Sequence, residues 1–350
     1  MKKHFIFLAS AALVIAASCN KENINVPVED TAVETELITV QLNPETKTSL
    51  SDMETVWSEG DAVSVTVGGN KIGTLTLVEG NTFSGEIEAG HTGDATLNYP
   101  ADVTTVPATQ VAVEGSFANG AALLEGKTTV DVLRAGEGAT LSNKTALLKF
   151  TTAQAGDVTF EVGAVKYTVT GCATGKTYYA CVAPAASVSF VARIDGYLSK
   201  KASANVTFEA NKIANLEELP APVASGWGLV GQHQGWSLKE SDLTRLYKEN
   251  NNLFVVKNIK LASTGFKFTE LKNTDWNLTF GSHSGEYKYD KSHGWYTGIY
   301  TNNRGDKSQD IKVNDWSKTY DVYLRFVQDA NWGKELGFSI VEAGQPYPTY

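Results

Sequence analysis

Alternating apolar and polar residues are the dominant pattern between residues 37 and 220. In the stretch 62–67, Val63, Val65 and Val67 alternate with Ser64 and Thr66. Because successive side chains of a strand point to opposite faces of a sheet, this period of two predicts a strand. Short stretches of similar character predict strands at 37–42, 62–67, 73–78, 82–87, 146–151, 157–162, 166–170, 177–182, 187–194 and 205–209. Helical periodicity is essentially absent.

Glycine-containing turns separate the predicted strands. Glu-Gly-Asp at 59–61, Gly-Gly-Asn at 68–70 and Glu-Gly-Asn at 79–81 each lie between two of them. Turns at such short intervals are typical of an all-β sandwich. A further strand is predicted at 253–261. The sequence therefore predicts an all-β protein with two β-sandwich domains in tandem.

The composition changes near Pro220-Ala221-Pro222, where we place the boundary between domains at 37–220 and 225–350. Together the two domains have more residues than a single hydrophobic core usually supports. The second domain holds 15 basic and 14 acidic residues, so most of the 39 acidic residues precede it. It also holds six of the seven Trp and nine of the fourteen Tyr residues. A function that depends on aromatic stacking is therefore expected in the second domain.

The N-terminus has the pattern of a bacterial secretion signal at residues 1–18. Lys2 and Lys3 precede an apolar run at 5–17, and small residues lead directly into Cys19. The run of about 13 residues is too short to cross a bilayer. The pattern resembles a lipobox, whose Cys carries acyl chains that anchor the mature protein. Ala16 stands where lipoproteins usually have Leu, so a plain signal-peptidase cut with a free Cys19 is the alternative.

The segment 19–36 is polar and acidic and contains Pro27, without the apolar pattern of a core. It predicts a flexible tether between the lipid and the folded part. No later segment approaches 18 apolar residues, so the lipid is the only expected membrane anchor. We expect an outer-membrane protein that faces the cell surface. The formal net charge of −9 argues against nucleic acid as a partner.

Cys172 and Cys181 are the two cysteines left once Cys19 is assigned to lipid. They lie in a Thr-, Val- and Tyr-rich stretch with the character of a hairpin. In an oxidising compartment they could pair across adjacent strands. They could equally be two small buried apolar residues of neighbouring strands.

Short motifs are spread along the first domain. They are Lys47-Thr48-Ser49-Leu50, Val-Trp-Ser-Glu-Gly-Asp at 56–61, Phe83-Ser84-Gly85, Tyr99-Pro100-Ala101, and Tyr178-Tyr179-Ala180 with Pro184. Together they resemble the fimbrillin-like domains of Bacteroidota lipoproteins. The resemblance implies a β-sandwich used for display, spacing or assembly. Trp57 beside a turn is expected to fill the core rather than to hold a ligand.

The second domain carries an ordered series of aromatic positions. Trp-Gly-Leu-Val-Gly at 227–231 is followed by Gly235-Trp236, by Gly-Phe-Lys-Phe at 265–268, and by Thr274-Asp275-Trp276 with Phe280-Gly281. This order resembles the carbohydrate-binding modules of the SusE/SusF starch-utilisation lipoproteins over most of residues 225–342. The resemblance implies a ligand site at Trp236, Lys267 and Trp276. It also implies an amide contact at Asn302, although Asn303-Arg304-Gly305 has the composition of a plain turn.

The chemistry of such a site follows from the shape of a sugar. A sugar ring has an apolar face of C–H groups, so two Trp rings set at an angle can hold a curved α-glucan while polar side chains bind its hydroxyl groups. Lys267 alternates with Phe266 and Phe268, which predicts an ammonium on the opposite sheet face from two core rings. Each of these residues could instead be structural. Trp295, with Tyr296 and Tyr300, is a second candidate cluster, and Trp332 a third.

Catalytic motifs are missing from the sequence. The five His residues form no metal-binding pair, and no Gly-x-Ser-x-Gly elbow, P-loop or Gly-x-Gly-x-x-Gly fingerprint occurs. A glycosidase needs two carboxylates across a cleft, and Asp275, Glu286, Asp290 and Asp306 supply candidates. A second domain of about 126 residues is small for a full catalytic cleft.

The sequence therefore predicts a non-catalytic outer-membrane lipoprotein that binds polysaccharide, a starch-like α-glucan, by Trp stacking. We expect no metal and no cofactor, and we expect other outer-membrane glycan-uptake proteins as partners. The alternatives are a structural pilus-like or adhesion component that binds protein partners, and a small hydrolase. Each of the three predicts a different ligand or product.

Overall fold

The computed structural model describes residues 33–44, 57–276, 279–283, 288–290, 295–300, 308–329 and 333–345. Strands dominate these residues, and the expected all-β class is confirmed. Within the described chain the helical elements are α1 (Val130–Arg134) and the short 3-10 helix η2 (Gln232–Gln234). The predicted signal peptide and Cys19 lie outside the described residues. None of the described helices has the length and apolar character needed to cross a membrane.

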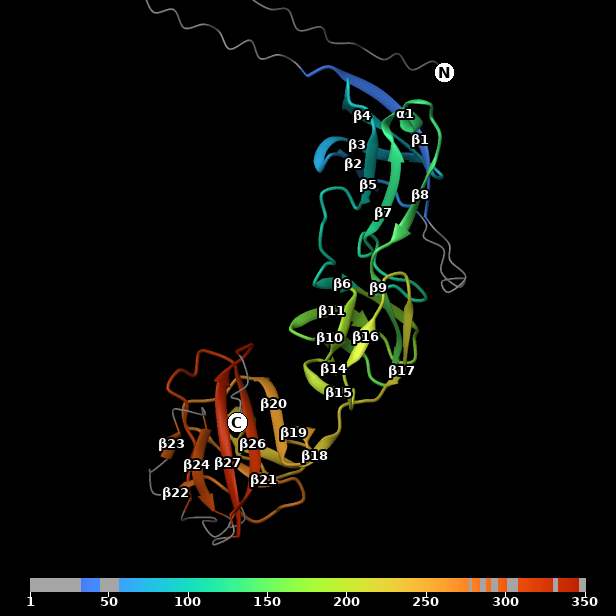
Figure 1. Ribbon diagram of the computed structural model, residues 1–350. Helices are drawn as coiled ribbons and strands as arrows, with labels where there is room; N and C mark the ends of the chain where they lie inside the picture. The colour runs from blue at the N-terminus through green and yellow to red at the C-terminus, as the bar shows by residue number, and fades with distance from the viewer. Residues whose placement is uncertain are drawn as a thin grey trace, which may run out of the picture. The chain divides into compact units, whose positions relative to one another are not determined.

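The first group of strands forms a closed barrel (Figure 1). Its order is β1-β4-β3-β2-β5-β7-β8, and β1 closes the barrel by pairing antiparallel with β4 and parallel with β8. The strands are β1 (Thr35–Pro44), β2 (Ala62–Val67), β3 (Asn70–Glu79), β4 (Thr82–Glu88), β5 (Asp94–Tyr99), β7 (Leu124–Thr129) and β8 (Ala139–Asn143). Val63 and Val65 are fully buried in its core, as the alternation at 62–67 predicts.

Trp57 is part of the barrel core. Its ring meets Phe83 and Tyr99 edge to face, with centroids 5.0 Å away in both cases. Its indole N–H donates to the backbone oxygen of Leu42 at 3.2 Å, which satisfies the polar atom that burial would otherwise leave unpaired. The expectation that Trp57 fills the core is confirmed.

A second group of strands follows the barrel and has a hydrophobic cluster of its own. A five-stranded sheet has the order β15-β14-β10-β11-β6, a three-stranded sheet the order β12-β9-β17, and β13 pairs with β16. The strands are β6 (Thr109–Val111), β9 (Ala146–Thr152), β10 (Gly156–Val162), β11 (Val165–Cys172), β12 (Tyr178–Val182), β13 (Ala185–Val188), β14 (Phe190–Ile194), β15 (Tyr197–Lys201), β16 (Val206–Phe208) and β17 (Ile213–Leu219). Phe150, Phe160 and Phe190 pack at its centre.

The third group begins after Leu219 and is built on an eight-stranded sheet of order β21-β18-β19-β20-β26-β27-β24-β23. Its strands are β18 (Ala224–Gly231), β19 (Thr244–Asn250), β20 (Leu253–Ile259), β21 (Phe266–Glu270), β23 (Lys288–Asp290), β24 (Trp295–Tyr300), β26 (Tyr320–Asp329) and β27 (Gly333–Glu342), and β22 (Ser282–His283) pairs with β25 (Ser308–Gln309). Phe266, Phe268 and Phe338 are buried in its core. We call this group the C-terminal domain.

Three features differ from the sequence-based expectations. The range 37–220, expected to form one sandwich, contains the closed barrel and a second group of strands with separate clusters. The single strand expected at 187–194 is divided into β13 and β14, because β13 leaves to pair with β16 while β14 joins β10. The tether expected to end at residue 36 gives way to β1 at Thr35.

Cys172 and Cys181 do not lie on a hairpin. Cys172 ends β11, which pairs with β10 and β6, whereas Cys181 lies in β12, which pairs with β9. Both thiols are free and buried, so the reading as two small apolar core residues is the correct one. Cys181 belongs to the barrel cluster and Cys172 to the second cluster.

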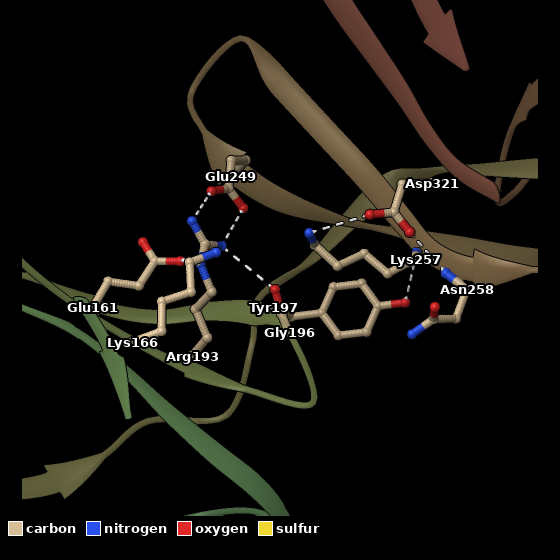
Figure 2. Close-up of polar contacts among 9 residues, drawn as sticks. All are labelled: Glu161, Lys166, Arg193, Gly196, Tyr197, Glu249, Lys257, Asn258 and Asp321. Carbon is tan, nitrogen blue, oxygen red and sulfur yellow. Dashed lines mark hydrogen bonds and ion pairs between the residues drawn. The ribbon is translucent and has the colours of Figure 1, made fainter. Parts of the chain in front are cut away.

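Arg193 of β14 binds carboxylates from two strand groups (Figure 2). Its guanidinium donates to both oxygens of Glu249 in β19, at 2.9 and 2.6 Å, and to Glu161 in β10 at 3.1 Å. The Arg193 and Glu249 side chains are only 17% and 19% exposed. A planar guanidinium that forms two hydrogen bonds to one carboxylate fixes the relative orientation of the two groups as well as the distance between them.

Tyr197 of β15 extends this contact onto the C-terminal domain (Figure 2). Its hydroxyl accepts a hydrogen bond from the Lys257 backbone N–H at 3.1 Å, and its ring lies 4.4 Å from that of Tyr247. The Lys257 ammonium pairs with Asp321 at 3.5 Å. Gly196, at a left-handed φ of 80°, lies so close to Lys257 that a Cβ there would be 3.1 Å from its side chain.

Candidate functional site

Trp236 and Trp276 meet at one edge of the C-terminal domain. Their ring centroids are 6.1 Å apart and their planes are inclined by 52°. Trp236 follows β18 and η2, whereas Trp276 follows β21, which is hydrogen-bonded to β18. The pairing of β18 with β21 thus brings together two loops that are distant in sequence. Trp276 is 43% exposed, so one ring of the pair presents a large apolar face to solvent.

The turn at Trp236 is held by hydrogen bonds within the loop. Gly235 and Trp236 take left-handed φ values of 77° and 59°, and the Trp236 N–H donates to the Gly231 carbonyl at 2.9 Å. The Gln234 side chain accepts from the Ser237 N–H and donates to its carbonyl. A left-handed conformation is uncommon for a bulky residue, so it marks a position where the surrounding structure dictates the backbone. Trp236 packs partly against the small cluster of Val230, Leu243 and Leu271.

The loop that carries Trp276 is organised by Asn273. The Asn273 amide donates to the Thr269 hydroxyl at 2.9 Å, and its oxygen accepts from the Asp275 N–H at 2.8 Å. The Thr279 hydroxyl donates to the Trp276 carbonyl at 2.8 Å. These bonds fix the backbone on both sides of Trp276 while its ring remains exposed. The segment 237–250 contains turns and β19.

Lys267 lies between two fully buried phenylalanines of β21, and its side chain therefore points away from the core. It pairs across the strands with Val230, against whose cluster Trp236 packs, so Lys267 shares a sheet face with the base of the Trp pair. The Lys267 ammonium lies 3.8 Å from Asp310, and the side chain is 13% exposed. A glucan hydroxyl would have to compete with Asp310 for this ammonium.

The other candidate site residues are described only in part by the structure. Asn302 and Trp332 lie outside the described residues. Trp295 begins β24, but its side chain is not described. Of the four acidic residues considered for a hydrolase, Asp275 is the one whose side chain is described, and it is exposed beside Trp276. The described residues contain no cluster of metal-binding side chains.

His233 is a residue that the sequence analysis did not connect with the site. It lies in η2, three residues before Trp236, and its Nε2 is 3.1 Å from the Thr244 hydroxyl. Its Nδ1 is buried without a hydrogen-bond partner among the described residues. Burial lowers the pKa of His233, because an imidazolium ion would lose its hydration there. The spacing to Trp236 was visible in the sequence, but the burial of the imidazole was not.

An exposed indole inclined against a half-buried one can bind an apolar, gently curved surface. Such a site suits the C–H face of a sugar or the side chain of a protein partner. The side chains of Asp275 and Lys267, in the segments that flank the two rings, supply polar atoms that can orient a bound ligand. The described part of the site thus has the features of a binding surface.

No family model matches this sequence, and no curated protein matches it. Among solved structures, the chain is similar to a candidate cell adhesion protein from Bacteroides ovatus, with 16% identity, 54% of this chain and 94% of that chain covered, and a TM-score of 0.36. A candidate cell adhesion protein from Bacteroides uniformis has 14% identity, coverages of 53% and 93%, and a TM-score of 0.32. A fimbrial protein from Bacteroides ovatus has 12% identity, coverages of 54% and 51%, and a TM-score of 0.32.

The names of these neighbours refer to cell adhesion and fimbriae. At these TM-scores the similarity says nothing about the ligand of this chain. The all-β class stands on the strands of the chain itself.

Proposed function

We propose that this protein is a non-catalytic adhesion protein of the cell surface whose C-terminal domain binds polysaccharide through Trp236 and Trp276. The observation that carries the proposal is the inclined, partly exposed pair of indole rings. Two adjacent aromatic rings, one of them exposed, present apolar area that a ligand can cover. The hydrogen bonds of Asn273 and Thr279 hold the Trp276 backbone in place, so little order would be lost on binding.

The shape of the pair favours a glycan chain. Two rings inclined by 52° form a shallow angle rather than a flat platform, and a curved glucan can lay one sugar on each ring. In this proposal Trp236 is the fixed inner ring and Trp276 the outer one. Lys267 and Asp275 bind hydroxyl groups at the edge.

The lipid anchor at Cys19 and the location on the outer membrane are parts of the same proposal. They rest on the apolar run at 5–17 and on the small residues before Cys19. In chain order the barrel and the second strand group lie between this anchor and the binding domain, and proteins of glycan uptake would be its neighbours at the membrane.

A second candidate function keeps the surface location but replaces the glycan with a protein partner, as in a pilus-like assembly. Leu37 of the first strand is an exposed apolar residue and favours this candidate, because apolar side chains at a protein surface can mark contacts with other proteins. Such a partner would bind the barrel instead of the Trp pair.

Affinity electrophoresis of the lipid-free chain from residue 20 tests the first candidate. Gels containing amylopectin, pullulan, dextran, xylan or mannan should retard the wild-type protein in at least one case, and Trp276→Ala should remove the retardation. Trp316→Ala is the matched control, because Trp316 is also exposed, at 59%, but lies in another loop. Unretarded migration of the folded wild type in every gel would reject glycan binding and leave the protein-binding candidate.

A further inference from the structure

A cleft of about 370 Å³ lies on the outer side of the barrel, far in sequence from the Trp pair. Val63 and Val65 of β2 point into the barrel core, so Ser64 and Thr66 point outward and line this cleft. The turn after β5 covers them. In that turn the Ala101 N–H donates to the Ala62 carbonyl at 2.8 Å, which holds the covering segment against the first residue of β2.

A row of polar side chains crosses the floor of the cleft. Ser64 pairs with Asn98 of β5, and Asn98 pairs with Glu125 of β7. Neighbouring strands are about 4.8 Å apart, so a hydroxyl, an amide and a carboxylate lie side by side at that spacing. No hydrogen bond joins the Ser64 hydroxyl or the Asn98 side-chain amide to another described residue, and Ser64 is nevertheless buried. The hydroxyl of Ser64 and the amide of Asn98 therefore offer donors and acceptors that the protein itself does not use.

Charged residues line the cleft in balanced pairs. The Lys71 ammonium of β3 lies 2.6 Å from Asp102 in the covering turn, and Lys144 lies 3.3 Å from Glu125. In the strand order β3-β2-β5-β7, these two ion pairs flank the strands that carry Ser64 and Asn98. The two positive and two negative charges cancel, so the cleft has no net attraction for an anion or a cation.

Apolar surface completes the lining. Val103 and Leu123, which are not buried in the barrel core, contribute to it. The side chains of Tyr99 and Leu124 pair on the opposite face of the strands and are buried in the barrel core, so a ligand in the cleft would not meet them. A site with both apolar surface and unused hydroxyl and amide groups suits a ligand that has C–H faces and many hydroxyl groups.

We infer that this cleft binds a neutral, hydroxyl-rich small ligand, a mono- or disaccharide, independently of the Trp pair in the C-terminal domain. Because the positive and negative charges of the lining balance, the cleft does not select a ligand by its net charge. The volume lies near the lower end of the range for ligand pockets, about 300–1,000 Å³, which limits the ligand to one or two sugar rings. The unused groups of Ser64 and Asn98 supply the hydrogen bonds.

Saturation-transfer NMR on the chain from residue 20 tests this site with glucose, galactose, N-acetylglucosamine, maltose and lactose as probes. The protein carries Trp276→Ala, so that a signal cannot come from the Trp pair. At least one sugar should receive saturation, and Asn98→Leu should weaken its binding on the order of tenfold, because it replaces the amide with an apolar group of similar size. Thr96→Ala, on the same strand and face but outside the lining, is the matched control and should leave binding unchanged.

Thr104→Trp provides a second blocking variant, because Thr104 is an exposed residue of the covering segment and its replacement leaves the strands intact. It should weaken binding as Asn98→Leu does. The inference is overturned if none of the five sugars receives saturation, or if a folded Asn98→Leu or Thr104→Trp protein binds like its parent. Loss of polysaccharide retention in Trp276→Ala, by contrast, reports only on the C-terminal domain, so the two proposals fail separately.

Discussion

The Arg193 guanidinium and the Glu249 carboxylate form a two-bond ion pair that joins β14 of the second strand group to β19 of the C-terminal domain (Figure 2). Burial by itself would lower the pKa of Arg193, but its hydrogen bonds and charge interactions with Glu249 and Glu161 outweigh this and raise it. The guanidinium of Arg193 therefore stays charged at any pH at which the protein folds.

Replacing Arg193 with Met should destabilise the protein by about 3 kcal/mol, because Glu249 and Glu161 would remain poorly solvated without their partner. Urea unfolding followed by far-UV circular dichroism measures the loss. The double variant Arg193→Met with Glu249→Gln should recover part of it, since one unpaired charge is removed. Lys176→Met is the control, because its pair with Glu114 is exposed and its loss should leave the midpoint in place.

Trp276 should be dispensable for folding, although the proposed function requires it. Its side chain is 43% exposed and lies outside the main core of the domain, so Trp276→Ala should change the free energy of unfolding by about 0.5 kcal/mol or less. Phe268→Ala should cost about 3–5 kcal/mol, because it opens a cavity in the core of the same domain. Thermal unfolding of both variants checks the contrast. A large loss in Trp276→Ala would show that the ring is structural.

The stability of the C-terminal domain should fall as the pH drops below about 6.5, the ordinary pKa of His. Because burial lowers the pKa of His233 in the folded state, the unfolded chain takes up a proton first and is favoured. Above about pH 6.5 the His233 imidazole is neutral in both the folded and the unfolded chain, and it makes no pH-dependent contribution to stability. Below the folded-state pKa the imidazole is protonated in both states, and the loss of stability reaches its maximum. The free-energy difference between wild type and His233→Gln, measured from pH 7.5 to 5, isolates the contribution. A difference independent of pH would contradict the assignment.

Cys172 and Cys181 should be unreactive in the folded protein. Burial raises the pKa of both thiols to about 12, with the Asp157 charge adding to the effect at Cys172, and thiolates are the reactive form. A thiol reagent at pH 8 should modify neither residue in the native chain from residue 20, and both in denaturant. Rapid reaction of the native protein would contradict their burial, and an absence of thiols after unfolding would reveal a disulfide.

The local alternation of apolar and polar residues was sufficient to predict many of the strands. The alternation at 62–67 predicted β2 with the correct bounds, and the stretches near 82–87, 146–151 and 157–162 correspond closely to β4, β9 and β10. The alternation of Lys267 with Phe266 and Phe268 gave the face of β21 that is buried. In each case one face of the strand lies against a core, and burial imposes a period of two on the residue types.

Strands without such a signal were missed. β5, β7, β8 and β15 contain Thr, Asn, Gly, Lys or Glu at many positions, and they exist because neighbouring strands supply their hydrogen bonds. The division of residues 37–220 into a barrel and a second strand group has the same origin. It depends on which strands pair, and the parallel pairing of β1 with β8 has no local signature.

The sequence by itself determined the all-β class, the core position of Trp57, and the aromatic residues available for binding. Tertiary structure decided which of those residues meet. Trp236 and Trp276 come together because β18 pairs with β21, while Cys172 and Cys181, closer in sequence, are separated because β11 and β12 join different sheets. The cleft beside Ser64 and Asn98 likewise arises from three strands in register. The burial of one face gives each strand a residue pattern that can be read from its own sequence. A site depends on contacts between strands, which only the folded chain brings together.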